Sequence, residues 1–293
     1  MTISIEQYIQ QGKDTIEREM KRYLTKNIPQ KLYESMAYSL FAGGKRLRPV
    51  LLFASFQSFG NRVEKAFRTA AALEMIHTYS LIHDDLPAMD DDDYRRGMLT
   101  NHKRFDEATA ILAGDGLLTF SFQIVNEDPL LTAEEKVYIT KQLAEASGPA
   151  GMVAGQVLDI EGERKQLTLE ELETVHRLKT GKLITFAVEA GAYLAGATEE
   201  QREHLQTFSD YLGLIFQVQD DILDVVGDPD KLGKPVGSDS ENEKSTYPNL
   251  LGLEGAKLKR AEYEKLALEA LERSGATGSY LVELVKYFGN RES

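Results

Sequence analysis

The segment FSDYLGLIFQVQDDILDVV, residues 208–226, decides the fold class of this chain. Its apolar residues recur at the three- and four-residue spacing of one face of an α-helix. They are Phe208, Tyr211, Leu212, Ile215, Val218, Ile222 and Val225. Four polar residues, Gln217, Asp220, Asp221 and Asp224, fall in one narrow stripe mostly on another side of that helix. The segment therefore predicts a long helix with one apolar and one acidic face.

The rest of the chain extends the helical pattern. Residues 108–125 and 183–195 are apolar nearly all round, as central helices are. The alternation expected of strands is scarce, and no Gly/Ser-rich or Pro-rich linker divides the chain. We expect an all-α protein with strands minor or absent, folded as a single domain over residues 1–293. Residues 227–248 form the one long polar stretch, which predicts a functional or disordered loop.

Composition excludes several classes of function. The chain has no cysteine, so a disulfide framework, a zinc thiolate site and a cysteine nucleophile are excluded. The net charge of -13 disfavours nonspecific binding of nucleic acid. The first twenty residues do not resemble a signal peptide, and no run of about 18 uninterrupted apolar residues predicts a transmembrane helix. We expect a cytoplasmic location, no nucleic-acid partner and no stable membrane insertion.

Two clusters of aspartate stand out. The first, HDDLPAMDDDD at 83–93, follows an apolar helical segment, and Pro87 favours a break there. The second is the stripe on residues 217–224, which no Lys or Arg shares. Neighbouring carboxylates repel, and more strongly when desolvated, so such a stripe indicates a bound cation or proton uptake. Carboxylate oxygens suit magnesium. A solvated acidic face is the alternative, less favoured for both clusters together.

Basic residues gather near one predicted helix start. In GGKRLRP, residues 43–49, the glycines allow close backbone approach and Pro49 suits a first helical turn. The three cations Lys45, Arg46 and Arg48 would fit a diphosphate at a helix N-terminus. Arg95 and Arg96 directly follow the first acidic run, where they would either neutralise it or bind an anion. The chain has neither of the common glycine-rich nucleotide motifs.

Together these motifs resemble the trans-isoprenyl diphosphate synthase family, closest to its bacterial farnesyl diphosphate synthases. The strings are GGKRLRP at 43–49, HTYSLIHDDLPAMDDDDYRRG at 77–97, ILAGDGL at 111–117, KTGKLI at 179–184, FQVQDDILDVVGD at 216–228, LGKPVGSD at 232–239 and KSTYP at 244–248. The resemblance implies one all-α domain of roughly ten core helices around a central cavity, commonly a homodimer. It implies a prenyltransferase that condenses dimethylallyl or geranyl diphosphate with isopentenyl diphosphate, giving farnesyl diphosphate and pyrophosphate.

The resemblance also implies a role for each motif residue. Asp84, Asp90 and Asp220 would hold magnesium, roughly three ions with substrate bound, and Asp85 and Asp224 would be further ligands or would support them. Arg95, Lys179 and Lys234 would grip the allylic diphosphate, and Lys45, Arg48, His77 and Arg96 the isopentenyl diphosphate. Thr180 and Gln217, with Lys179, would lie near the reacting carbons. Released pyrophosphate would take the proton.

Product length is the last expectation from the resemblance. Tyr79, five residues before Asp84 and beside Ser80, would close the cavity floor and stop growth near fifteen carbons. An ideal helical wheel places Ser80, not Tyr79, nearer the Asp84 face, whereas His77 falls within about 20° of Asp84. We interpret His83 as structural.

Four alternatives remain open. They are a geranyl or geranylgeranyl diphosphate synthase of the same family, a terpene cyclase or head-to-head condensing enzyme, an HD-type metal phosphohydrolase, and a non-catalytic metal-buffering helical protein.

Overall fold

The computed structural model describes residues 3–24, 27–163, 165–226, 245–277 and 279–291. The chain forms two compact units, one within residues 1–53 and 62–141 and the other within residues 54–61 and 142–293. Each unit is described by itself, and the expected single domain around a central cavity stays a prediction. Lys234 and most of the polar stretch 227–248 lie outside the described residues.

The first unit is helical apart from one small hairpin. Its elements are α1 (Ile5–Tyr23), α2 (Gln30–Leu40), the start of α3 (Leu47–Phe59), the 3₁₀ turn η1 (Val63–Ala66), α4 (Phe67–Asp84), β1 (Tyr94–Arg95), β2 (Met98–Leu99), α5 (Asn101–Arg104), α6 (Glu107–Asn126) and the first part of α7 (Ala133–Ser147). The strands β1 and β2 pair antiparallel, with Tyr94 opposite Leu99. The expectation of an all-α protein with minor strands is confirmed.

Helix α4 is the centre of the first unit and packs against α1, α2 and α6. Ala70, Ala71 and Ala72 are fully buried, and these small side chains allow neighbouring helices to approach. The helix ends at Asp84, as Pro87 predicts, because proline lacks an N–H and its ring clashes with a continuing helix.

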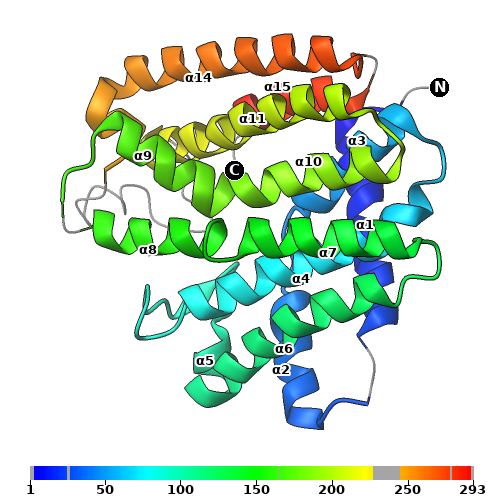
Figure 1. Cartoon of the computed structure of the whole chain (residues 1–293). Coiled ribbons are helices and arrows are strands. Elements are labelled where there is room, and N and C mark those ends of the chain that lie inside the picture. Colours follow the sequence, from blue (N-terminus) through cyan, green and yellow to red (C-terminus); the bar gives the residue numbers. More distant parts are fainter. Residues whose placement is uncertain (1–2, 25–26, 164, 227–244, 278, 292–293) are drawn as a thin grey trace. The chain divides into compact units, whose positions relative to one another are not determined.

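The second unit consists of helices around α11 (Figure 1). Its elements are the end of α3 and of α7, α8 (Met152–Gly162), α9 (Leu169–His176), the π-helical turn η2 (Arg177–Gly181), α10 (Lys182–Leu194), α11 (Glu199–Val226), α14 (Tyr247–Ser274) and α15 (Tyr280–Asn290). Helix α11 contains the predicted segment 208–226, and Phe208, Leu212, Ile215 and Val218 are fully buried. It packs along α14 and against α10 and α15.

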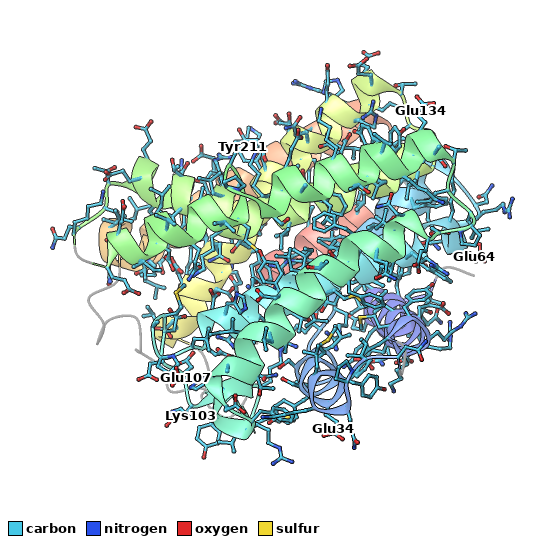
Figure 2. The ribbon with its side chains drawn as sticks, turned by 60° about the horizontal axis from the view of Figure 1, so that its bottom comes forward. Glu34, Glu64, Lys103, Glu107, Glu134 and Tyr211 are labelled. Atoms are coloured by element: carbon cyan, nitrogen blue, oxygen red, sulfur yellow. The ribbon has the colours of Figure 1, made fainter. Side chains whose placement is uncertain are left out.

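Charged side chains cover the outside of the helices. Figure 2 shows Glu34, Lys103 and Glu107 projecting away from the helix axes, and all three are exposed. Among the described residues one helix, α6, is long and apolar enough to cross a membrane, and 44% of its apolar window is buried. Because core helices of water-soluble proteins have the same length and composition, this is weak evidence for insertion.

Candidate active site

The first aspartate cluster folds back on the end of α4. The backbone N–H of Asp90 donates to the carbonyl of Asp84 at 2.9 Å, and that of Asp91 donates to Leu86 at 3.1 Å. Asp91 adopts the left-handed region with φ 52°, which non-glycine residues seldom occupy outside tight turns and functional sites. The turn therefore brings two of the expected magnesium residues, Asp84 and Asp90, together through the backbone.

Asp85 is buried and paired with an arginine. Its Oδ1 accepts a hydrogen bond from Arg95 Nε at 2.6 Å and forms an ion pair with Arg95 Nη2, also at 2.6 Å, and the residue is 3% exposed. Burial raises the pKa of Asp85, while the Arg95 hydrogen bond and charge oppose that rise; nearby Asp92 and Asp90 add to it. Arg95 thus neutralises part of the acidic run in this structure. The pair also lines a pocket with Arg96, Thr78 and Asn101.

Positive charge surrounds His77. Arg48 Nη1 lies 3.2 Å from His77 Nε2, and because a guanidinium can only donate, this ring nitrogen accepts. Burial lowers the pKa of His77 well below its usual value, and the charges of Arg48, Arg96, Arg46 and Arg95 lower it further. His77 is therefore neutral, and the structure brings together three residues expected to hold a diphosphate: Arg48, His77 and Arg96.

Gly44 makes room for the guanidinium of Arg96. A Cβ at Gly44 would lie 2.7 Å from Arg96 Cζ, and Gly44 has a φ of 112° that favours glycine. Arg96 Nη1 donates to the Gly43 carbonyl at 2.5 Å, and Arg96 itself has a φ of 55°. Burial lowers the pKa of Arg96, and Glu74 only partly opposes that effect. The guanidinium of Arg96 is therefore held in a position in which it could bind an anion.

Arg46 corrects one expectation from the basic string. Its side chain is fully buried, donates to Glu74 Oε1 at 2.7 Å and to the Leu40 carbonyl at 2.5 Å, and has a backbone φ of 54°. With this backbone conformation the Arg46 side chain points into the first unit, where it stabilises the loop that precedes α3. Lys45 lies in the loop before α3 and Arg48 within the first turn of α3, and their expected contacts with a diphosphate stay a prediction.

The expected product-length residues lie one turn before the acidic end of α4. Tyr79 is 7% exposed; burial raises the pKa of its hydroxyl, and the charge of Asp84 adds to that rise. The ring therefore lies within the electrostatic reach of Asp84 despite its place on an ideal wheel. Ser80 is less buried, and its Oγ donates to the His77 carbonyl at 2.9 Å.

The second cluster has a cation that the sequence interpretation missed. Arg291 Nη2 lies 2.6 Å from Asp220 Oδ1 and donates to the Phe216 carbonyl at 2.8 Å. Its guanidinium also lies over the Phe216 ring, 3.9 Å from the centroid. The stripe is therefore not uncompensated, because a residue 71 positions later in the chain supplies the charge. No periodic pattern could have revealed this partner.

The other two aspartates of the stripe are buried. Asp221 Oδ2 accepts the backbone N–H of Tyr247 at 2.9 Å, at the first residue of α14. A carboxylate is favourable there because the first N–H groups of a helix lack intrahelical partners. Asp221 therefore fixes the start of α14. Asp224, expected to support the metal site, is 3% exposed.

Lys179 and Thr180 lie in the π-helical turn η2, a feature that sequence periodicity did not predict. Lys179 Nζ is 2.5 Å from Asp159 Oδ2, and Thr180 is buried. A Cβ at Gly155 would lie 2.1 Å from the backbone nitrogen of Lys179, and a Cβ at Gly213 would lie 3.0 Å from Gly181 Cα. Glycines on α8 and α11 thus leave space for the wider turn, a geometry often found at functional sites.

Gln217 contacts the end of α9. Its Nε2 is 3.5 Å from His176 Nδ1, and the His176 ring stacks on Tyr247 with centroids 5.9 Å apart. His176 Nε2 is buried without a hydrogen-bond partner among the described residues. Burial lowers the pKa of His176 to about 4, and the charge of Lys179 lowers it further against that of Asp159. No motif in the sequence indicated a role for this histidine.

The two aspartate clusters lie in different units, the first within residues 62–141 and the second within residues 142–293. Within the described residues, no three aspartate, glutamate or histidine side chains converge into a complete metal site. Magnesium commonly takes only one or two carboxylates and completes its shell with waters and phosphate oxygens. The acidic groups around Asp84 and Asp85 fit such a partial ligand set.

Comparison with known proteins decides the family. The sequence profile described as polyprenyl synthetase matches residues 29–285. The chain belongs to the polyprenyl synthetase family. It is 50% identical to the farnesyl diphosphate synthase of Geobacillus stearothermophilus over 97% of both chains. It is 49% identical to that of Bacillus subtilis over the whole of both. A crystal structure of a geranyltransferase from Legionella pneumophila, 37% identical, matches 98% of this chain and 97% of its own with a TM-score of 0.86.

Membership of the polyprenyl synthetase family confirms the family and fold class expected from the sequence. The relatives' names also confirm the expected class of enzyme, a prenyltransferase that makes isoprenyl diphosphates. The roles of individual residues remain proposals.

Proposed function

We propose that this chain is a magnesium-dependent farnesyl diphosphate synthase, condensing dimethylallyl and then geranyl diphosphate with isopentenyl diphosphate. One observation carries the proposal: Arg48 contacts the neutral His77, and the charges of Arg95 and Arg96 act on the same ring, near the acidic turn of Asp84 and Asp85. Cations next to carboxylates form a site for a polyanion that arrives with a divalent metal. The names of relatives half-identical over nearly full length support the substrate class.

Asp84, Asp90 and Asp220 are the residues that would hold magnesium, with Asp85 and Asp224 in support. When bound, the ions would supply neutralisation of the negative charge that develops on the departing pyrophosphate.

The chain's own groups bind and orient the substrates. Lys45, Arg48 and Arg96 hold isopentenyl diphosphate. The neutral His77 accepts a hydrogen bond from Arg48 and so orients that guanidinium towards the diphosphate. Arg95, Lys179 and Lys234 hold the allylic diphosphate. Both Arg95 and Lys179 pair with carboxylates in this structure, so each exchanges an internal partner for phosphate oxygen.

The reaction then needs positioning and dipoles. The allylic C–O bond breaks, the double bond of isopentenyl diphosphate forms the new C–C bond, and pyrophosphate accepts the proton that leaves. The Thr180 hydroxyl and Gln217 amide stabilise the developing carbocation without acting as nucleophiles. Tyr79 closes the floor at fifteen carbons, which favours farnesyl diphosphate over the geranyl and geranylgeranyl alternatives.

We further propose a homodimer in the cytoplasm. Helix α6 and the start of α7 expose the apolar side chains of Ile111, Leu112 and Val137 by 42%, 58% and 69%. Asp115 lies on the same stretch of α6 with its side chain 57% exposed. On α6 the exposed apolar residues Ile111 and Leu112 lie within one turn of the exposed Asp115, and such a mixed helix surface suits a protein partner better than lipid.

Product analysis with labelled isopentenyl diphosphate tests the function. With either starter and magnesium, we expect label in farnesyl diphosphate, and with a chelator we expect none. Incubation with farnesyl diphosphate alone separates the main rival, because a hydrocarbon product would indicate a terpene cyclase. Uptake of magnesium without any turnover would instead favour the metal-buffering alternative.

A further inference from the structure

His83 connects the acidic end of α4 to α6. Its Nε2 lies 3.1 Å from the carbonyl oxygen of Ile111 and 4.0 Å from Asp115 Oδ1. A carbonyl can only accept, so Nε2 carries the hydrogen and the imidazole is anchored to the backbone of α6. From the sequence, we interpret this residue as structural, with no part in the reaction.

The His83 ring packs against Gly114 of α6. A Cβ at Gly114 would lie 2.2 Å from His83 Nε2 and 2.5 Å from Cδ2, a distance that real side chains do not reach. Gly114 is fully enclosed in the ILAGDGL motif of α6, between Ala113 and Asp115. The absence of a side chain at position 114 therefore leaves the space that the His83 imidazole occupies against α6.

The imidazole also packs against the ring of Tyr79. The two ring centroids are 5.7 Å apart with an interplanar angle of 78°, an edge-to-face arrangement. Aromatic pairs favour this geometry, which adds to the stabilisation from burial alone. A continuous series of contacts thus runs from the α6 backbone through His83 to the Tyr79 ring.

We propose that His83 is a positioning residue for product length: it braces the Tyr79 ring from α6. The inference rests on the proposed function, in which Tyr79 stops the growing chain. A tyrosine without this brace gains access to other side-chain rotamers, some of which open the floor to a longer chain. As a positioning residue, His83 itself touches no substrate.

Two substitutions separate the ring from the anchor. His83→Gln keeps an N–H donor for the Ile111 carbonyl but removes the ring that packs on Tyr79. His83→Phe keeps the ring and loses the donor. With geranyl diphosphate and excess isopentenyl diphosphate, we expect His83→Gln to raise the ratio of twenty- to fifteen-carbon product roughly two- to tenfold, the range that such ring pairs span. His83→Phe should raise it less.

A double-mutant cycle distinguishes bracing from a general loss of structure. In a Tyr79→Ala background the ring to be braced is gone, so His83→Gln should no longer change the product ratio. The proposal is overturned if His83→Gln leaves the ratio at the wild-type value, or if its effect is as large without Tyr79. Failure of the proposed function would be seen separately, as wild-type protein that makes no fifteen-carbon product.

Discussion

Arg291 Nη2 lies 2.6 Å from Asp220 Oδ1, so the last described residue of the chain neutralises a carboxylate expected to bind magnesium. The Arg291 side chain is 6% exposed, and that of Asp220 is 44% exposed. One face of Asp220 is thus turned to the internal cation and another stays accessible. The negative potential that a metal meets here depends on both residues.

Arg291→Gln should therefore lower the magnesium concentration needed for half-maximal activity. Removing a positive charge beside Asp220 strengthens the attraction for a divalent cation. The loss of the hydrogen bond to Phe216 should also reduce the free energy of unfolding by about 1–2 kcal/mol. Rates measured against free magnesium, with thermal unfolding alongside, check both. Arg273→Gln is the matched control, because Arg273 is exposed near the end of α14. An unchanged or raised magnesium requirement would contradict the expectation.

Gly44→Ala should weaken binding of isopentenyl diphosphate by displacing Arg96. The added methyl would lie 2.7 Å from the Arg96 guanidinium, and loss of a charge-assisted contact corresponds to a rise in KM of roughly tenfold. Gly43→Ala is a close control: its φ of 90° imposes similar backbone strain, but nothing lies within 4 Å of its Cβ. Steady-state kinetics with isopentenyl diphosphate varied check the difference. Equal KM values for the two variants would show that backbone strain, and not displacement of Arg96, weakens the binding of isopentenyl diphosphate.

Glu74→Ala should destabilise the first unit strongly. It removes the nearer of two carboxylates that pair with the fully buried Arg46 side chain and leaves Glu17, 3.4 Å from Arg46 Nε. Breaking a buried ion pair typically costs about 3–5 kcal/mol. Denaturant unfolding measures the change. The exposed pair Lys265–Glu269 provides the contrast, and Glu269→Ala should cost about 1 kcal/mol or less. Similar losses for both variants would mean that the buried pair does not support the loop.

Stability should fall between pH 6.5 and 4 partly because of His176. Burial depresses the pKa of this residue from 6.5 to about 4, so below pH 6.5 the unfolded chain binds a proton that the folded chain does not. The contribution of neutral, buried His176 to the free energy of unfolding is complete above pH 6.5 and is lost as pH falls towards 4. His77, whose pKa is also lowered, acts in the same direction. His176→Asn should therefore make the pH dependence of unfolding free energy shallower, and an identical slope would exclude the effect.

Leu112→Glu should dissociate the proposed dimer. Leu112 is 58% exposed on α6, so the substitution should change the stability of a folded monomer by about 0.5 kcal/mol or less. Sedimentation velocity gives the mass of each species. Leu258→Glu is the control, since Leu258 is 73% exposed on α14. A wild-type monomer, or a Leu112→Glu dimer, would contradict the proposal.

Sequence periodicity predicted the fold class because local patterns determine helices. Residues 208–226 form part of one helix, and the break before Pro87 lies where proline forces it. Pairings between distant residues could not be predicted in this way. Arg291 meets Asp220, and Arg46 turns inward to Glu74, only through tertiary packing. The π-helical turn at Lys179 has no 3.6-residue signature, although the glycines that accommodate it are visible in the sequence.

The most direct measurement quantifies both products from geranyl and isopentenyl diphosphates in one reaction. With magnesium present, the proposed function predicts one pyrophosphate released for each farnesyl diphosphate formed, and neither product after chelation. Pyrophosphate released without a new carbon–carbon bond, or a fifteen-carbon hydrocarbon in place of the diphosphate, would contradict it.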